Sequence, residues 1–104
     1  MTPESAVLKM ALDYLAAKHI WAMRCNTGAV KTDNRFFRFG IPGMADVLAL
    51  VPMQGLFMPV WIECKANGRQ SLLQKSFEDH VLNQGMKYFL IRDLEGLELA
   101  LASL

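Results

Sequence analysis

The segment PVWIECKANGRQS, residues 59–71, places an acid and a base at the end of an apolar run. Pro59 marks the start of this run, and the Val, Trp and Ile at positions 60–62 are residue types enriched in β-strands. Glu63 and Lys65 follow, on either side of Cys64. Because side chains alternate along a strand, the acid and the base should point to one face and the cysteine to the other. The segment therefore predicts a buried strand that carries two charged groups on one face at its end.

Helices are predicted on both sides of this strand. Thr2 and Pro3 are typical of an N-cap and a first helical residue, and apolar residues at helical spacing then predict a helix over residues 3–18. Ser71 can cap a second helix that runs to about residue 84 and ends at Gly85. A short terminal helix is expected over residues 94–104.

Four further strands complete the prediction. We expect strands over residues 20–25, 35–39, 45–51 and 87–92 and a tight GIPG turn over residues 40–43. Residues 26–34 should form a loop or a wide hairpin connection, and loops are expected over residues 52–59 and 66–71. The order α-β-β-β-β-α-β-α predicts a single α/β domain over residues 1–104, with a mixed β-sheet flanked by helices.

The composition agrees with one small globular domain. The chain has 104 residues, of which 53% are hydrophobic and 20% charged. A domain of this size buries so much apolar surface with difficulty, so we expect a homodimer, with the apolar tip QGLFM (residues 54–58) as a candidate contact. The start of the chain lacks a basic region followed by an apolar core, which predicts no signal peptide. No run approaches the roughly 18 apolar residues of a membrane span. The two cysteines favour a reducing, cytoplasmic setting.

Positive charge is concentrated in the middle of the chain, although the net charge is only +1. Between residues 24 and 75 the acids are Asp33, Asp46 and Glu63, and after residue 75 the acids prevail. The bases of this middle segment are Arg24, Lys31, Arg35, Arg38, Lys65, Arg69 and Lys75. This asymmetry is compatible with a basic face that binds a polyanion.

Asp46 is the second acid that bears on the opening segment. A hairpin between the strand after Asp46 and the strand that holds Glu63 would place Asp46 opposite Glu63 or Lys65, roughly 5 Å apart at Cβ. Two carboxylates at one place repel each other unless a positive group lies between them, and a hard divalent cation held by oxygen ligands meets that need. The alternative is an exposed cross-strand ion pair between Asp46 and Lys65, with Glu63 incidental.

Ordered motifs along the chain resemble a known nuclease family. GMAD (residues 43–46) followed by ECK (residues 63–65) is similar to the D…E-x-K core of the PD-(D/E)xK nuclease superfamily. The segment NGRQSLLQKSFEDHVLNQGMKYFLI (residues 67–91) resembles one subgroup, the VRR-NUC domain. PESAVLKMALDYL (residues 3–15) and RCNTG (residues 24–28) also look like parts of that domain. Ala45 departs from the family, which usually has proline there. The resemblance implies a small PD-(D/E)xK nuclease core over residues 1–104.

The resemblance also implies roles for individual residues. Asp46, Glu63 and the backbone carbonyl of Cys64 match the ligands of Mg²⁺ or Mn²⁺, and Lys65 matches the catalytic lysine. Glu4 matches an early helix glutamate that faces the metal, and Gln74 matches a helix glutamine that closes the site. Together with the distribution of charge, the loops and strands supply candidates for contacts to DNA, which are Asn26, Arg35, Arg38, Arg69 and Lys75.

A metal-dependent DNA endonuclease is therefore the expected function. Stand-alone domains of this family resemble dimeric resolvases of four-way junctions, which implies action on branched DNA in recombination, repair or phage DNA processing. The setting would be the cytoplasm of a bacterium or of a phage-infected host cell. The alternative is a catalytically idle module that binds nucleic acid or has a structural role while keeping the nuclease fold. Binding of Mg²⁺ or Mn²⁺ distinguishes the two, because an idle module has no need of the metal.

Overall fold

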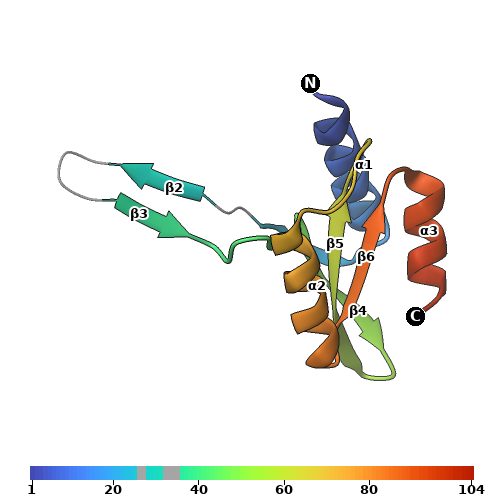
Figure 1. Cartoon of the computed structure of the whole chain (residues 1–104). Helices are drawn as coiled ribbons and strands as arrows, with labels where there is room; N and C mark the ends of the chain where they lie inside the picture. The colour runs from blue at the N-terminus through green and yellow to red at the C-terminus, as the bar shows by residue number, and fades with distance from the viewer. Residues whose placement is uncertain (26–27, 32–35) are drawn as a thin grey trace.

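This computed structural model describes residues 1–25, 28–31 and 36–104, which contain three helices and six strands (Figure 1). The helices are α1 (Pro3–Ala17), α2 (Leu72–Asn83) and α3 (Leu94–Ala102). The strands are β1 (Trp21–Arg24), β2 (Gly28–Lys31), β3 (Phe36–Phe39), β4 (Val47–Met53), β5 (Leu56–Cys64) and β6 (Lys87–Ile91). No described helix has the length and apolar character that crossing a membrane requires.

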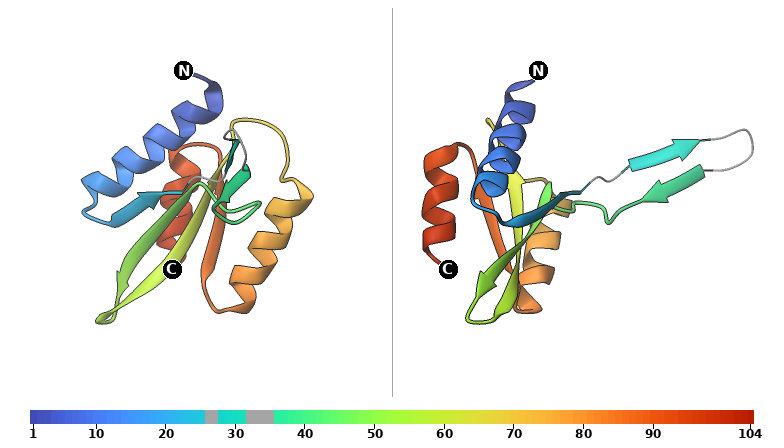
Figure 2. Two further views of the ribbon diagram at one scale, coloured as in Figure 1. Left: turned by 90° about the vertical axis from the view of Figure 1, so that its left-hand side faces the viewer. Right: turned by 180° about the vertical axis from the view of Figure 1, so that it is seen from behind.

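Four of the strands form a mixed sheet in the order β1-β4-β5-β6. The pairs β1–β4 and β4–β5 are antiparallel, and β5–β6 is parallel. Helices α1 and α3 lie on one face of this sheet and α2 lies on the other (Figures 1 and 2). The prediction of a small α/β domain with a mixed sheet between helices is confirmed, and the helices begin and end within two residues of the expected positions.

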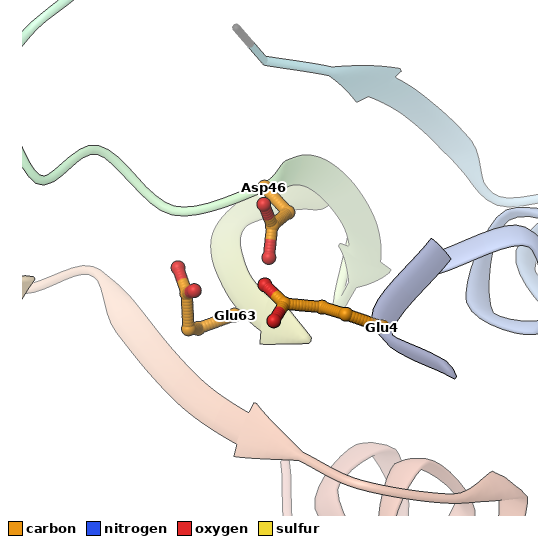
Figure 3. Close-up of side chains that lie close together, drawn as sticks. All are labelled: Glu4, Asp46 and Glu63. Atoms are coloured by element: carbon orange, nitrogen blue, oxygen red, sulfur yellow. The ribbon is translucent and has the colours of Figure 1, made fainter. Parts of the chain in front are cut away.

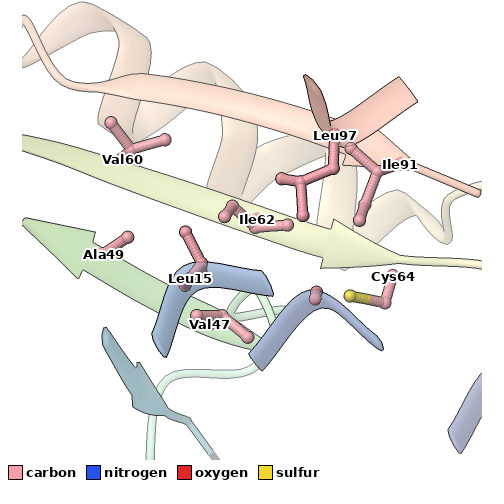
Figure 4. Packing of buried hydrophobic residues seen from close by; sticks show 9 residues of the cluster. Leu15, Val47, Ala49, Val60, Ile62, Cys64, Ile91 and Leu97 are labelled. Carbon is pink, nitrogen blue, oxygen red and sulfur yellow. The ribbon is translucent and has the colours of Figure 1, made fainter. Parts of the chain in front are cut away.

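The main core lies between the sheet and the pair α1 and α3. Alternate residues of the two central strands point to this face, and the described core is completed by residues from both helices and β6 (Figure 4). Ala11 and Leu15, four positions apart in α1, pack on the sheet with Leu97 of α3. The other members of this cluster are Val47, Ala49, Val60, Ile62, Cys64 and Ile91.

The hairpin between β4 and β5 is tighter than expected, and the predicted loop over residues 52–59 is wrong. Met53 pairs with Leu56, so only Gln54 and Gly55 form the turn, both with positive φ of 50° and 81°. The two prolines of this segment suggested a loop, yet both lie in strands. At Pro52 and Pro59 the strand has a hydrogen-bonded neighbour on one side only, because the β1–β4 and β5–β6 pairings do not reach them. Such edge positions tolerate proline.

A second correction concerns the segment after β1. The sequence predicts a loop or wide hairpin connection over residues 26–34, without a strand, but Gly28–Lys31 forms β2 and pairs with β3 in a separate two-stranded sheet. This hairpin, the β2–β3 arm, projects away from the rest of the domain (Figure 1 and right-hand view of Figure 2). The surrounding Asn, Thr, Gly and Asp residues favour turns, so the sequence pattern does not reveal a strand that is only four residues long.

The turn that precedes β4 is locked against α2. Gly43 has a φ of +79°, and a Cβ atom added there would collide with the carbonyl group of Leu73 in the first turn of α2. The same turn of α2 carries Gln74, which closes a capping box with Ser71. Gly43 therefore sets how closely the segment leading into β4 approaches the start of α2.

This close approach predicts different costs for two glycine substitutions. Gly43→Ala should lower the free energy of unfolding by more than Gly55→Ala, because Gly55 also has positive φ (+81°) but has open space around its Cβ position. Gly55→Ala should cost about 1–2 kcal/mol from the left-handed backbone alone, and Gly43→Ala should cost that and the displacement of α2 in addition. Urea denaturation of both variants measures the difference. Equal losses would show that α2 does not press on Gly43.

Candidate metal centre

Three carboxylates from different parts of the chain meet at one end of the sheet. Glu4 lies in the first turn of α1, where the Thr2 side chain caps the helix and the helix dipole favours an acid. Asp46 directly precedes β4, and Glu63 lies near the end of β5. Val47 pairs with Ile62, so Asp46 lies one position further on, across from Glu63. One oxygen of each carboxylate lies within 4.8 Å of one oxygen of each of the others (Figure 3).

Glu63 is the most constrained of the three. It is 1% exposed, the only buried charged or polar residue of the described chain. Its Oε2 accepts a hydrogen bond from the Gln74 amide (3.2 Å) and lies 3.8 Å from the Lys65 Nζ. Its Oε1 is buried and has no hydrogen-bond donor among the described residues. A buried acceptor left unpaired costs about 1–3 kcal/mol, which a cation bound at Oε1 would relieve.

Gln74 connects the start of α2 to this carboxylate. Its Oε1 accepts the backbone N–H of Ser71 (2.9 Å), while its own backbone N–H donates to the Ser71 hydroxyl (3.1 Å). The capping box therefore orients the Gln74 amide with its Oε1 toward Ser71, and its Nε2 donates a hydrogen bond to Glu63. The cap of a helix and the orientation of a buried acid therefore depend on one side chain.

Asp46 is held from both neighbouring strands. Its Oδ2 accepts the backbone N–H of Cys64 (2.7 Å), and its backbone carbonyl accepts the N–H of Cys25 (2.7 Å). The first bond aligns the Asp46 carboxylate with the end of β5, next to Glu63. The second bond continues the β1–β4 pairing beyond Arg24. These two bonds give Asp46 a fixed position although it lies outside the regular strand.

The electrostatics of the cluster favour a proton on Glu63 when no cation is present. Burial raises the pKa of the Glu63 carboxyl to about 8, and the neighbouring negative charges of Asp46 and Glu4 act in the same direction. Lys65 opposes this rise. A divalent cation would reverse the balance, because it stabilises the ionised form of the carboxylates that bind it.

Lys65 lies with Glu63 and not with Asp46. The Lys65 side chain is 14% exposed, and its ion-pair partner among the described residues is Glu63. An exposed pair between Asp46 and Lys65, the alternative drawn from the sequence, does not form in the part of the chain that the structure describes. Glu63 is a buried member of the cluster, so the view that it is incidental is wrong.

Cys64 takes part through its backbone. Its side chain lies in the main core, on the opposite face from Glu63, and burial raises the pKa of its thiol to about 12. Thiolate chemistry at this residue is therefore disfavoured near neutral pH. The backbone N–H supports Asp46, and a role for the carbonyl oxygen as a metal ligand stays a prediction.

A cleft of about 530 Å³ lies beside Glu4 and Asp46. Two of its lining residues, Arg24 and Asn67, were not among the site residues predicted from the sequence. Arg24 is the last residue of β1, and no partner for its guanidinium appears among the described ion pairs. Only the β1–β4 register, which the sequence does not reveal, brings it to Asp46. The described lining of the cleft is Thr2, Pro3, Glu4, Ser5, Leu8, Arg24, Asp46, Ala66 and Asn67.

Of the predicted contacts to nucleic acid, the two whose side chains the structure describes, Arg69 and Lys75, are not among the described lining residues of this cleft. Arg69 is exposed in the loop after β5, and Lys75 lies on α2, where its Nζ is 3.3 Å from Glu78 and 3.5 Å from Asp79. Asn26 and Arg35 lie outside the described residues, and for Arg38 in β3 the structure describes the backbone alone. The loop that carries Arg69 is tied down at Gly68, whose carbonyl accepts a 2.8 Å bond from Arg92, and at Gln70, which donates to Glu78 and Tyr88.

Comparison of the chain with protein-family models, with curated proteins and with solved structures finds no match.

The raised pKa of Glu63 predicts how the stability of the metal-free protein changes with pH. Since the folded state holds a proton that the unfolded carboxyl releases near pH 4.5, stability should fall as the pH rises from about 4.5 to about 8. One such group contributes at most about 1.4 kcal/mol per pH unit. Urea denaturation in the presence of a chelator, at about pH 5.5 and about pH 8, measures the slope.

Glu63→Gln provides the control, because it removes this carboxyl and leaves the other titrating groups in place. The variant should lose most of the negative slope and be more stable than the parent at the higher pH. An equal slope in both proteins would assign the pH dependence to other groups.

Proposed function

We propose that this protein is a metal-dependent nuclease that hydrolyses phosphodiester bonds in DNA, on a PD-(D/E)xK core of the VRR-NUC type. The observation that carries the proposal is the buried Glu63 carboxylate, which clusters with Asp46 and Glu4 and has one oxygen without a hydrogen-bond donor among the described residues. The D…E-x-K motif and the mixed α/β sheet are both consistent with such a core. The reaction is inferred from the resemblance of the motifs to the nuclease family, and the arrangement of the three carboxylates is consistent with that reaction.

The donors at this site suit Mg²⁺ or Mn²⁺. Carboxylate oxygens are the ligands that hard divalent ions prefer, and Asp46, Glu63 and Glu4 would provide them, with the Cys64 carbonyl as a further candidate. When bound, such an ion acidifies a coordinated water and neutralises charge on the phosphate. Glu4 is exposed at the first turn of α1 and adjoins the cleft, so it faces the side from which a substrate would approach.

Lys65 and Gln74 support the reaction from the buried side. The Lys65 ammonium lies 3.8 Å from Glu63 Oε2 and is largely shielded from water, which strengthens its interaction with nearby negative charge. In that position it can orient an attacking water, accept its proton or stabilise negative charge that develops on the phosphate. Gln74 holds Glu63 Oε2, and Oε1, which has no donor among the described residues, would be left to bind the cation.

The proposed substrate is DNA, with branched or four-way-junction forms preferred. The cleft of about 530 Å³ next to the carboxylates has room for a backbone phosphate and carries donors from Arg24 and Asn67. The competing proposal is an idle module that binds nucleic acid or has a structural role. The unpaired buried oxygen of Glu63 counts against it, because an idle module gains nothing from keeping an acid at that cost.

Two substitutions separate the metal ligand from the catalytic cation. Glu63→Gln should weaken Mn²⁺ binding at least about tenfold, since a neutral amide is a poor ligand for a hard ion, and should abolish cleavage. Lys65→Ala should leave the Mn²⁺ affinity within about threefold and lower the cleavage rate by about 10²-fold or more. Calorimetric titration with Mn²⁺ and cleavage of duplex, flap and four-way-junction DNA measure both effects.

Glu98→Gln is the matched control, because Glu98 is an exposed acid on α3, away from the cluster. It should leave both metal binding and cleavage unchanged. A parent protein that binds no Mn²⁺ would favour the idle module, and full cleavage by Lys65→Ala would remove the lysine from the mechanism.

Arg24 should contribute to binding the DNA backbone at the cleft. Arg24→Ala, made in the Lys65→Ala background so that the DNA stays intact, should weaken binding for all sequences alike and reduce the salt dependence by about one phosphate contact. Fluorescence anisotropy at several salt concentrations measures this. Lys87→Ala, a charge-matched change at the exposed start of β6, should have a smaller effect, and equal effects would show that only overall charge matters.

A further inference from the structure

A groove of about 720 Å³ lies between the C-terminal end of α1 and α3, on the sheet face that these two helices cover (Figure 1). Tyr14 and Lys18 line it from α1, and the rest of its described lining comes from the end of β4 and from α3. Glu4 of the metal centre lies about three turns before Tyr14, so roughly 15 Å of helix separates the two places. The groove is therefore distinct from the candidate metal centre, and both can be occupied at the same time.

The floor of the groove is apolar and continuous with the main core. It is formed by Tyr14, Ile20, Val51 and Leu101, which line the groove and also pack against the buried residues of the core. An apolar side chain that enters the groove would extend the core and leave water, which is the main driving force of association.

One side of α3 faces the groove. Glu95, Glu98, Leu99 and Ala102 all line it, and their spacing of three, four and seven positions places them on one side of the helix. Leu99 is 66% exposed, so most of a large apolar side chain lies in water beside an apolar floor. This side of α3 combines an exposed leucine with two acids.

Negative charge prevails along the groove. Glu95 and Glu98 are exposed, and neither takes part in an ion pair among the described residues. The base in the described lining is Lys18, whose Nζ lies 5.6 Å from the centre of the Tyr14 ring in a cation–π contact. The helix dipole favours an acid at Glu95 in the first turn of α3, but Glu98 lies beyond the reach of that effect. The excess of acid opposes the approach of nucleic acid and favours a cationic partner.

The walls of the groove favour a partner whose own backbone is already hydrogen-bonded. Between its ends, the backbone groups of α3 bond within the helix, so they offer no row of free donors and acceptors to an extended chain. A helix meets this condition, because its backbone groups are also paired internally. Binding would then depend on side chains alone, as when an amphipathic helix lies in an apolar groove.

We propose that this groove binds a basic amphipathic helix of a partner protein. Apolar side chains on one side of that helix would pack on the floor and against Leu99, and its Lys or Arg side chains would lie next to Glu95 and Glu98. The partner would be held at the end of α1 that is remote from Glu4, so it would leave the cleft beside the carboxylates open. The groove would thus attach this domain to another protein without blocking the proposed nuclease site.

Two fluorescent peptides of about 15 residues, a length at which an isolated helix can form, test the proposal. Both carry Leu on one helical side, and the rest of the sequence is Lys in one peptide and Glu in the other. Fluorescence anisotropy should show saturable binding of the Lys peptide to the parent, and binding of the Glu peptide at least about tenfold weaker.

Two matched pairs of variants locate the binding site. Glu98→Lys should weaken binding of the Lys peptide at least about tenfold, whereas Asp79→Lys, the same change of charge at an exposed acid on α2, should change it by less than about twofold. Leu99→Ser should weaken it about fivefold or more. Leu73→Ser is the control for this change, because Leu73 is 59% exposed but lies on α2, at the other face of the sheet. Circular dichroism checks that each variant is folded, and Glu98→Lys decides alone if Leu99→Ser is not.

The proposal would be overturned if the parent bound neither peptide, if it bound both equally, or if Glu98→Lys and Asp79→Lys had equal effects. Light scattering of the parent and of Leu99→Ser without peptide tests a different occupant. A dimer that Leu99→Ser converts to a monomer would assign the groove to a second copy of the chain and would also overturn the proposal. These measurements need neither metal nor DNA, so their outcome is separate from that of the nuclease proposal.

Discussion

The burial of the Glu63 carboxylate is the constraint around which the described site is arranged. A carboxylate that is removed from water needs hydrogen bonds, a counter-charge or a proton. Here one oxygen accepts a hydrogen bond from the Gln74 amide and lies near Lys65, while the other has no donor among the described residues. Without metal the acid responds by retaining its proton, as its raised pKa shows. A cation bound among the three carboxylates would stabilise their ionised forms beyond what Lys65 provides.

The supports of this carboxylate extend into the fold. Gln74 is held by the capping box of α2, and the start of α2 is held against the turn that contains Gly43. Asp46 is aligned by backbone groups of Cys25 and Cys64 from the two strands beside it. The site therefore uses secondary-structure contacts that the domain must form in any case, a helix cap and the ends of strand ladders. If these carboxylates bind an ion as proposed, their positions are already set by these contacts, which would reduce the conformational cost of binding.

The two faces of the sheet have different tasks in the proposed molecule. The face under α1 and α3 is filled by the main core and supplies stability. The face under α2 carries the buried acid at one end and uncovered aromatic residues over β1 and the first part of β5.

Local sequence patterns determined much of this protein. The apolar spacing and caps specify the three helices, and the E-x-K spacing places Glu63 and Lys65 on one face with Cys64 on the other, because these depend on residues only a few positions apart. Asp46, Glu63 and Gln74 were also found from motifs. The length of the β4–β5 hairpin was not predicted correctly. Its two prolines lie where a strand has no neighbour on one side, and a single sequence does not show where strand pairing ends.

Tertiary structure alone decided the features that depend on register between distant segments. The nearness of Arg24 to Asp46, the unpaired oxygen of Glu63 and the projecting arm all follow from which strands are neighbours and how far each extends. Strand pairing is a choice among many long-range contacts of similar local quality, and packing of the whole chain selects among them.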